Sequence, residues 1–332
     1  MPSMTGEDWS WPSDPTGRRP SSLAAAASQS LEKRWQAASR YDRRARLTRA
    51  TRLTPTGTVN LAFEVSDPEP FAFEPGQFVG IGAHVGGRSY RRSPYCILSP
   101  PNDERTFELL VRIVPDGPVS QYLGSLQPGD TVSFRGPTGR SMMPGDAESG
   151  LVLLATGVGI APFCSLVEHL LAAGFSRPVH LYWGLRLEQD ICLTGRLDEL
   201  TSTHPNFGYR ISLSQPPPSW DGLTGRITES VPPLLDRLGG TLFYLCGNGA
   251  MTEELGSALS DLGVFHTSIY EEPYFNRRHR PDPAVLGAIR ARFVAHDLES
   301  RWMGDETELF PLEAPVGMRS RKAAERRPDD GE

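Results

Sequence analysis

The sequence predicts a two-domain protein in which an antiparallel β-barrel is followed by an α/β domain with a parallel sheet. Two changes of hydrophobic pattern along the chain support this prediction. From about residue 42 to residue 145, short β-type runs are separated by turn residues, which is typical of an antiparallel barrel or sandwich. After residue 150, short apolar runs alternate with segments of helical length, which is typical of a parallel sheet covered by helices. The chain has 332 residues, enough for each domain to bury a core.

The composition of the chain sets the expected domain boundaries. Residues 1–40 are rich in Ser, Pro, Ala and Gly and are expected to form a disordered lead. The barrel is expected over residues 41–147 and the α/β domain over residues 148–276. Residues 277–332 are expected to form a C-terminal extension with one helix and a charged tail.

The strands are expected at eleven short runs, in chain order. The barrel should contain RARLTRATRLT, TVNLAFEVS, QFVGIGAHV, YCILS, TFELLVRIV and TVSFRG. The parallel sheet should contain LVLLA, PVHLYWG, YRISLS, TLFYLC and FHTSIY, with a helix over PFCSLVEHLLAAG.

Charge and composition argue against several classes of protein. The net charge of −6 gives no case for nucleic-acid binding, and no apolar run reaches the roughly 20 residues of a membrane span. The first residues lack the apolar stretch of a secretory signal. The cysteines are scattered in apolar surroundings and show no metal or cluster spacing, so we expect reduced thiols in a cytoplasmic protein and no metal site. They are Cys96, Cys164, Cys192 and Cys246.

A glycine turn follows the first predicted parallel strand, in TGVGIAP. Thr156, Gly157 and Gly159 stand between a buried strand and a helix, where glycine lets backbone amides approach a phosphate. Taken alone, this pattern is also compatible with glycines that serve packing only. It is not GxGxxG, which argues against an ordinary Rossmann dehydrogenase.

Several motifs in this order resemble the ferredoxin–NADP reductase family over about residues 42–276. They are RSYRRSPYCILSPP, GPTG, TGVGIAP and LCGNGAM. The resemblance implies an antiparallel FAD-binding barrel followed by a nicotinamide-nucleotide domain. It also implies a flavoprotein oxidoreductase that passes electrons between NAD(P)H and a separate one-electron carrier, such as ferredoxin or flavodoxin.

In this family an Arg-x-Tyr-Ser strand brings arginine to the FAD pyrophosphate, tyrosine to the isoalloxazine and serine near flavin N5. Matching YCILSPP to this pattern makes Tyr95 the stacking ring and puts Cys96 in place of serine. Arg92 then precedes the tyrosine by three residues instead of two, so we expect a bulge at Pro94 that keeps both side chains on one face. A second match, with Arg88 and Tyr90, has the family spacing but places Arg91 at the serine position.

The resemblance implies further FAD contacts outside this strand. The G-x-x-S of Gly117 and Ser120 would open a short helix whose amides face the pyrophosphate. The ending IYEEPYFN resembles that of bacterial members, with Glu272 near N5 and an aromatic ring covering the flavin. The residues expected to contact FAD are Arg92, Ser93, Tyr95, Cys96, Val111, Gly117, Val119, Ser120, Tyr274 and Phe275.

The nicotinamide nucleotide is expected along the carboxyl ends of the parallel strands. Arg186 matches the Gly-x-Arg segment of the family. NADPH-specific members often place arginine after the serine that matches Ser214, but Gln215 stands there, so the preference between NADPH and NADH stays open. The expected NAD(P) contacts are Thr156, Gly157, Gly159, Arg186, Ser214, Gln215, Arg226, Cys246, Gly247 and Met251.

The resemblance implies that Cys96, Cys246 and Glu272 are the catalytic residues, and a buried structural thiol is an equally open interpretation for Cys246. The reductase component of a multicomponent oxygenase is an alternative function. A flavin-free nucleotide-binding or regulatory protein on the same scaffold is another, because serine is replaced by Cys96. The basic run RYDRRARLTRATR is expected either to dock an acidic electron carrier or to form a solvated face.

Overall fold

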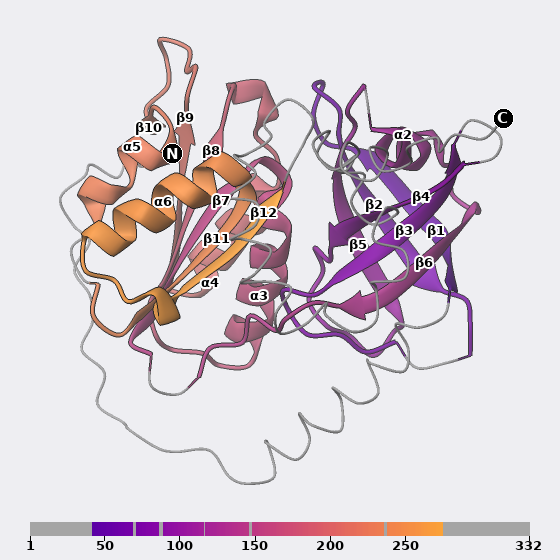
Figure 1. Cartoon of the computed structure of the whole chain (residues 1–332), viewed down its shortest axis with the longest axis horizontal. Coiled ribbons are helices and arrows are strands. Elements are labelled where there is room, and N and C mark those ends of the chain that lie inside the picture. The colour runs from indigo at the N-terminus through magenta and orange to yellow at the C-terminus, as the bar shows by residue number, and fades with distance from the viewer. Residues whose placement is uncertain are drawn as a thin grey trace, which may run out of the picture.

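The computed structural model describes residues 42–68, 71–85, 89–115, 117–145, 148–235 and 238–274. The predicted lead, Phe275 and the C-terminal extension lie outside these residues. Within them, two six-stranded sheets form two domains that lie side by side (Figure 1).

The first domain is the predicted antiparallel barrel. Its strands are β1 (Arg43–Arg52), β2 (Thr58–Val65), β3 (Phe78–Val85), β4 (Ser89–Cys96), β5 (Thr106–Arg112) and β6 (Thr131–Thr138). They lie in the order β4-β3-β6-β1-β2-β5, and a bridge between Ile97 and Leu109 joins the two ends of this order. Helix α2 (Pro118–Ser125) connects β5 to β6. Strand β4 includes Arg91 and Arg92, so it begins earlier than the predicted strand YCILS.

The second domain contains the predicted parallel sheet, in the order β10-β9-β8-β7-β11-β12. Its strands are β7 (Gly150–Thr156), β8 (Val179–Leu185), β9 (Phe207–Leu213), β10 (Leu223–Thr224), β11 (Thr241–Asn248) and β12 (Ile269–Tyr274). The α-helices are α3 (Ala161–Ala172), α4 (Thr194–Thr203), α5 (Ile227–Ser230) and α6 (Gly249–Asp261). The short 3-10 helices are η1 (Gly157–Ile160), η2 (Glu188–Asp190), η3 (Pro232–Leu234) and η4 (His266–Ser268). The two-residue strand β10 was not predicted.

The helices cover both faces of this sheet. Helices α3 and α4 pack on one face, and α5 and α6 pack on the other. The core under α3 also includes Cys96, Leu98, Leu110 and Met142 of the barrel, so one apolar cluster joins the two domains. Figure 1 shows α3 between the parallel sheet and the barrel. No helix among the described residues is long and apolar enough to cross a membrane.

Candidate active site at the domain boundary

The domains meet where the end of β4 reaches the carboxyl ends of β11 and β12. Cys96 is the last residue of β4, while Cys246 and Glu272 are direct neighbours on β11 and β12. The Cys96 thiol donates to Glu272 Oε1 at 3.3 Å and accepts a hydrogen bond from the Tyr274 hydroxyl at 2.8 Å. Cys246 is fully buried beside Cys96 and acts on the pKa of its thiol. The structure therefore brings together Tyr274 and the three residues predicted to be catalytic.

Burial sets the protonation of this cluster. Removal from water raises the pKa of Glu272 to about 7, although the hydrogen bond from Cys96 lowers it. Contact with Cys246, together with burial, raises the pKa of the Cys96 thiol well above its usual value. Burial likewise raises the pKa of the Tyr274 hydroxyl. Near neutral pH, Glu272 is therefore the member of this cluster whose shifted pKa lets it gain or lose a proton.

Arg92 and Tyr95 lie on opposite faces of β4. The prediction of a bulge at Pro94 is wrong, because the described strand has no bulge there. Strands β3 and β4 pair without a register shift along all eight residues of β4. Side chains three positions apart on a regular strand point to opposite faces. A single flat ligand on one face therefore does not reach both side chains.

Arg92 is buried, with a relative exposure of 2%, beside Asp42 and Tyr90. Its guanidinium forms an ion pair with Asp42 at 2.7 Å and donates to the Tyr90 hydroxyl at 3.0 Å. Asp42 is shared with Arg135, at 2.6 Å. The Nε of Arg92 is buried and has no hydrogen-bond partner among the described residues. A buried donor without a partner is costly, so this position fits an anionic group from outside the chain.

Tyr90 lines a cavity of about 470 Å³ that also borders Tyr122 of α2. The second sequence match, which pairs Tyr90 with Arg88, is not resolved by the structure because Arg88 lies outside the described residues. No pattern in the sequence pointed to Asp42, which comes directly before the first strand.

Three of the predicted FAD contacts pack on the barrel core. Val111 and Val119 are members of that core, and Tyr95 is partly buried against it. Burial raises the pKa of the Tyr95 hydroxyl far above its usual value. Ser93 is the partner of Ile81 in the register of β3 and β4.

The loop before α2 is held together by the predicted Ser120. Its hydroxyl accepts a hydrogen bond from the Val114 amide at 3.2 Å and donates to the Gly117 carbonyl at 2.9 Å. The hydroxyl therefore stabilises this turn, and the first amides of α2 are the groups left for a ligand.

The two glycines of TGVG have different roles. A Cβ on Gly159 would come within 2.3 Å of the Cys246 carbonyl oxygen, so this glycine lets the turn pack against β11. Gly157 has a φ of +55°, and a Cβ there would meet nothing within 4 Å. Thr156 accepts a hydrogen bond from the Asn248 amide at 2.9 Å, which ties β7 to β11. The open side of the turn is therefore at Gly157, while Gly159 fulfils the packing role that the sequence had left open.

The predicted nucleotide contacts that directly follow β8 and β9 lie together at the carboxyl ends of these strands. Arg186 Nε donates to Gln215 Oε1 at 3.2 Å, and the Gln215 amide donates to the Arg186 carbonyl at 2.9 Å. Ser214 is exposed beside them, and Arg226 is exposed just before α5. Met251 instead belongs to the core between the sheet and α6.

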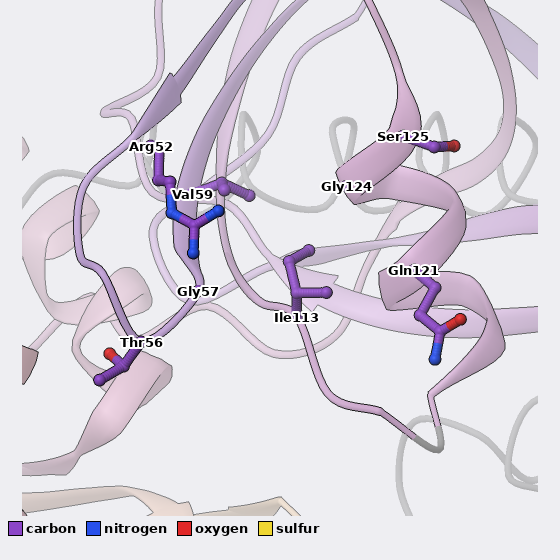
Figure 2. A pocket seen from close by; sticks show the side chains of 8 residues that line it. All are labelled: Arg52, Thr56, Gly57, Val59, Ile113, Gln121, Gly124 and Ser125. Carbon is purple, nitrogen blue, oxygen red and sulfur yellow. The ribbon is translucent and has the colours of Figure 1, made fainter.

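The cavity in Figure 2 lies on the barrel, between the β1–β2 turn and α2. Its volume is about 410 Å³, and none of the predicted site residues lines it. Arg52 at its rim donates to the backbone carbonyls of Thr54 and Pro55.

Two family models match the two domains. One, described as an oxidoreductase FAD-binding domain, matches residues 44–142, and the other, an oxidoreductase NAD-binding domain, matches residues 153–255. Ferredoxin–NADP reductase B of Sorangium cellulosum is 32% identical over 64% of this chain and 90% of its own length. The chain belongs to the ferredoxin–NADP reductase family. It is an FAD-dependent NAD(P)H oxidoreductase with the predicted order of domains.

Other relatives are matched over different shares of their own length. The ferredoxin–NAD(P)(+) reductase component of the naphthalene 1,2-dioxygenase/salicylate 5-hydroxylase systems of Ralstonia is 32% identical, and the match covers 62% of each chain. The chain thus spans less than two thirds of that relative. The crystal structure of the Amycolatopsis cytochrome P450 reductase GcoB is 28% identical, with a TM-score of 0.62 and coverage of 70% of this chain and 69% of that one. A Neisseria gonorrhoeae ferredoxin NADP+ reductase with bound FAD and NADP shares the fold at 24% identity and a TM-score of 0.62, over 70% of this chain and 99% of that chain.

Proposed function

We propose that the protein passes electrons between NAD(P)H and a separate one-electron carrier, such as ferredoxin or flavodoxin, by way of FAD. The observation that carries this proposal is the direct contact of Cys96 in the FAD-binding domain with Glu272 and Tyr274 in the nucleotide domain. Bound FAD supplies the chemistry that links a two-electron hydride donor to a one-electron acceptor. The chain supplies binding, orientation and a proton-holding group at this contact.

The geometry supports Arg92 as the residue that holds the FAD pyrophosphate, because its buried Nε lacks a partner among the described residues. Since β4 is an edge strand, a dinucleotide that crosses its open edge would meet Arg92 on one face and Tyr95 on the other. Cys96 would then lie beside the reacting end of the flavin, with Glu272 as its hydrogen-bond acceptor.

Tyr274 occupies the point that the nicotinamide has to reach. Its hydroxyl is bound to Cys96, so the ring has to leave this position before a nicotinamide lies there. The turn at Thr156 and Gly157, followed by the amino end of α3, would bind the nucleotide phosphates. Arg186 and Gln215 would hold the adenosine end. Because Gln215 brings no charge of its own, we expect NADPH and NADH to differ by less than about 1000-fold in kcat/KM, which is roughly 4 kcal/mol.

The same site would serve as the reductase component of an oxygenase system, which is how the Ralstonia relative is named. The match to an FAD-binding domain argues against the flavin-free alternative. The ferredoxin or flavodoxin reductase and the oxygenase reductase component share the same hydride step. They differ only in the protein that accepts the electrons.

The experiment is anaerobic reduction of the purified yellow protein by NADPH and by NADH, followed by transfer to ferredoxin, flavodoxin or an oxygenase ferredoxin component. We expect both nucleotides to bleach the flavin absorbance and at least one protein carrier to reoxidise it. A protein that binds no FAD, or that passes electrons to none of these carriers, would contradict the proposed function. Reoxidation by an oxygenase ferredoxin alone would favour the second function.

A further inference from the structure

Asp190 connects the nucleotide-binding loop after β8 to the FAD-binding domain. Its Oδ1 accepts hydrogen bonds from Thr56 Oγ1 at 2.6 Å and from Arg112 Nη1 at 3.1 Å. Its Oδ2 accepts from the backbone amide of Leu187 at 3.3 Å. One carboxylate therefore holds the loop that begins at Arg186 and two residues of the other domain.

The Asp190 contact forms a closed group of hydrogen bonds. Arg112 also donates to Thr56 Oγ1 at 2.8 Å, so each of the three side chains contacts the other two. The side chain of Asp190 is 11% exposed, which limits competition from water. Burial alone would raise the pKa of Asp190, but the hydrogen bonds from Thr56 and Arg112 outweigh it and hold the pKa below its usual value. The side chain of Asp190 is therefore a charged carboxylate at neutral pH.

The two ends of the proposed nucleotide site depend on different parts of the molecule. The adenosine end, at Arg186 and Gln215, lies wholly within the nucleotide domain. The nicotinamide end, at Cys96, requires the barrel as well. The distance between these ends therefore depends on how the loop of Arg186 is attached to the barrel, as well as on its bonds to the segment after β9.

We propose that Asp190 is a positioning residue that holds the adenosine-binding loop in register with the hydride-transfer point. This inference rests on the proposed function, because it takes Arg186 and Gln215 as the adenosine end of the site. Small displacements of reacting atoms slow a reaction strongly, and a shift of about 1 Å can lower its rate by roughly 100-fold. Loosening the Asp190 contact should therefore impair hydride transfer without preventing the adenosine end from binding.

A second polar contact between the domains provides a matched control. Arg196 of α4 pairs with Glu108 of β5 at 3.4 Å and also with Glu168 of α3. This contact joins the same two domains but holds no part of the loop from Arg186 to Asp190. Glu108→Gln weakens this contact, and also the pair that Glu108 forms with Arg49 inside the barrel, so it tests packing away from the Asp190 loop.

The test measures two quantities on the FAD-loaded protein. The first is the rate constant of flavin reduction by NADPH and NADH in single-turnover stopped flow. The second is the dissociation constant of adenosine 2′,5′-bisphosphate and of AMP. Thr56→Val removes one hydrogen bond to Asp190 from the barrel side and leaves the Leu187 bond intact. We expect Thr56→Val to slow hydride transfer about ten-fold while the fragment dissociation constants change less than about two-fold and the flavin spectrum is preserved.

Asp190→Ala also removes the Leu187 bond, so it should slow hydride transfer and weaken both fragments. Adding Thr56→Val to Asp190→Ala should have no further effect, because the two residues share one contact. Arg112→Met repeats the barrel-side test if Thr56→Val proves unstable.

Three outcomes would overturn the inference. These are an unchanged rate constant in Thr56→Val and Arg112→Met, an equal loss in Glu108→Gln, and additive losses in the double variant. Failure of the proposed function would give a different result. In that case the wild-type protein would bind neither adenosine 2′,5′-bisphosphate nor AMP, or Arg186→Ala would bind both as tightly as the wild type does.

Discussion

Glu272 links the stability of the folded protein to pH, because its carboxyl group is withdrawn from water at the contact between the two domains, where it accepts a hydrogen bond from Cys96. Its pKa is about 7 in the folded protein, whereas a glutamate in an unfolded chain has a pKa near 4.3. The folded state therefore binds the proton more tightly. The stability that this provides is complete below about pH 4 and is lost as the pH rises through 7.

We predict that Glu272→Gln removes this pH dependence. Between pH 5 and pH 8, the free energy of unfolding of the wild type should fall by up to about 3 kcal/mol relative to the glutamine variant. Urea unfolding of both proteins across this range measures the difference, and all other titrating groups cancel in the comparison. A constant difference between the two proteins would mean that Glu272 is not buried as a neutral acid.

Arg92 is the other residue whose surroundings lead to a direct prediction. Losing a charge-assisted hydrogen bond costs about 1.5–3 kcal/mol, so Arg92→Ala should weaken FAD binding by about ten-fold to 100-fold. The dissociation constant can be measured by fluorescence as FAD is titrated into apoprotein. Arg135→Ala is the matched control, because Arg135 pairs with the same Asp42 carboxylate. Normal FAD binding in Arg92→Ala, with loss in Arg88→Ala, would favour the second match of the sequence motif.

At the level of elements, the turn between β7 and α3 contains two glycines that should respond differently to alanine. A Cβ on Gly159 would overlap the backbone of β11, which has to move to accept it. We predict that Gly159→Ala lowers the free energy of unfolding by about 1–3 kcal/mol or more. Gly157→Ala meets open space and suffers only the cost of its left-handed backbone, about 1 kcal/mol.

Thermal and urea unfolding compare the two variants, with the Gly157→Ala variant as the control for backbone strain. Equal losses would mean that β11 adjusts easily to the extra methyl group. In that case Gly159 would not be a packing residue.

The order of the elements could be predicted from the sequence, because strand and helix periods are local properties. The grouping of Cys96, Cys246, Glu272 and Tyr274 was implied by the resemblance to the family. For Cys246 and Glu272 it also follows from the parallel pairing of β11 and β12, whose carboxyl ends lie at one edge of the sheet. The face on which Arg92 lies was predicted wrongly, because the register of β4 depends on its pairing with β3 and not on Pro94 alone. The Asp190 contact could not be predicted, because it depends on how two separately formed domains pack.

At the level of the whole molecule, the basic run along β1 carries less free charge than its sequence suggests. Arg43 is buried against Asp67, and Arg46 and Arg49 pair with Glu64 and Glu108. Arg44 is exposed, and its guanidinium forms no ion pair within the part of the chain that the structure describes. If this face docks an acidic carrier, Arg44 should contribute more than its neighbours.

We predict that Arg44→Glu slows electron transfer to an acidic ferredoxin by roughly three- to ten-fold at low salt, and that added salt removes the difference. The second-order rate constant of ferredoxin reduction measures the effect. Arg46→Glu, on the same face, should have a smaller effect. A rate that does not depend on salt in the wild type would assign the basic run to a solvated face.

The hydrogen bond between Tyr274 and Cys96 joins residues that are 178 positions apart in the chain. Domains generally fold as units and in order of synthesis, so the barrel and most of the parallel sheet can form their own cores before this contact exists. Closing so long a stretch of chain is entropically costly until both domains are in place. We therefore expect the active site to assemble last during folding. In a refolding experiment, the Cys96 thiol should remain open to alkylation after the barrel has gained its secondary structure, and it should become protected only when β12 is added to the sheet.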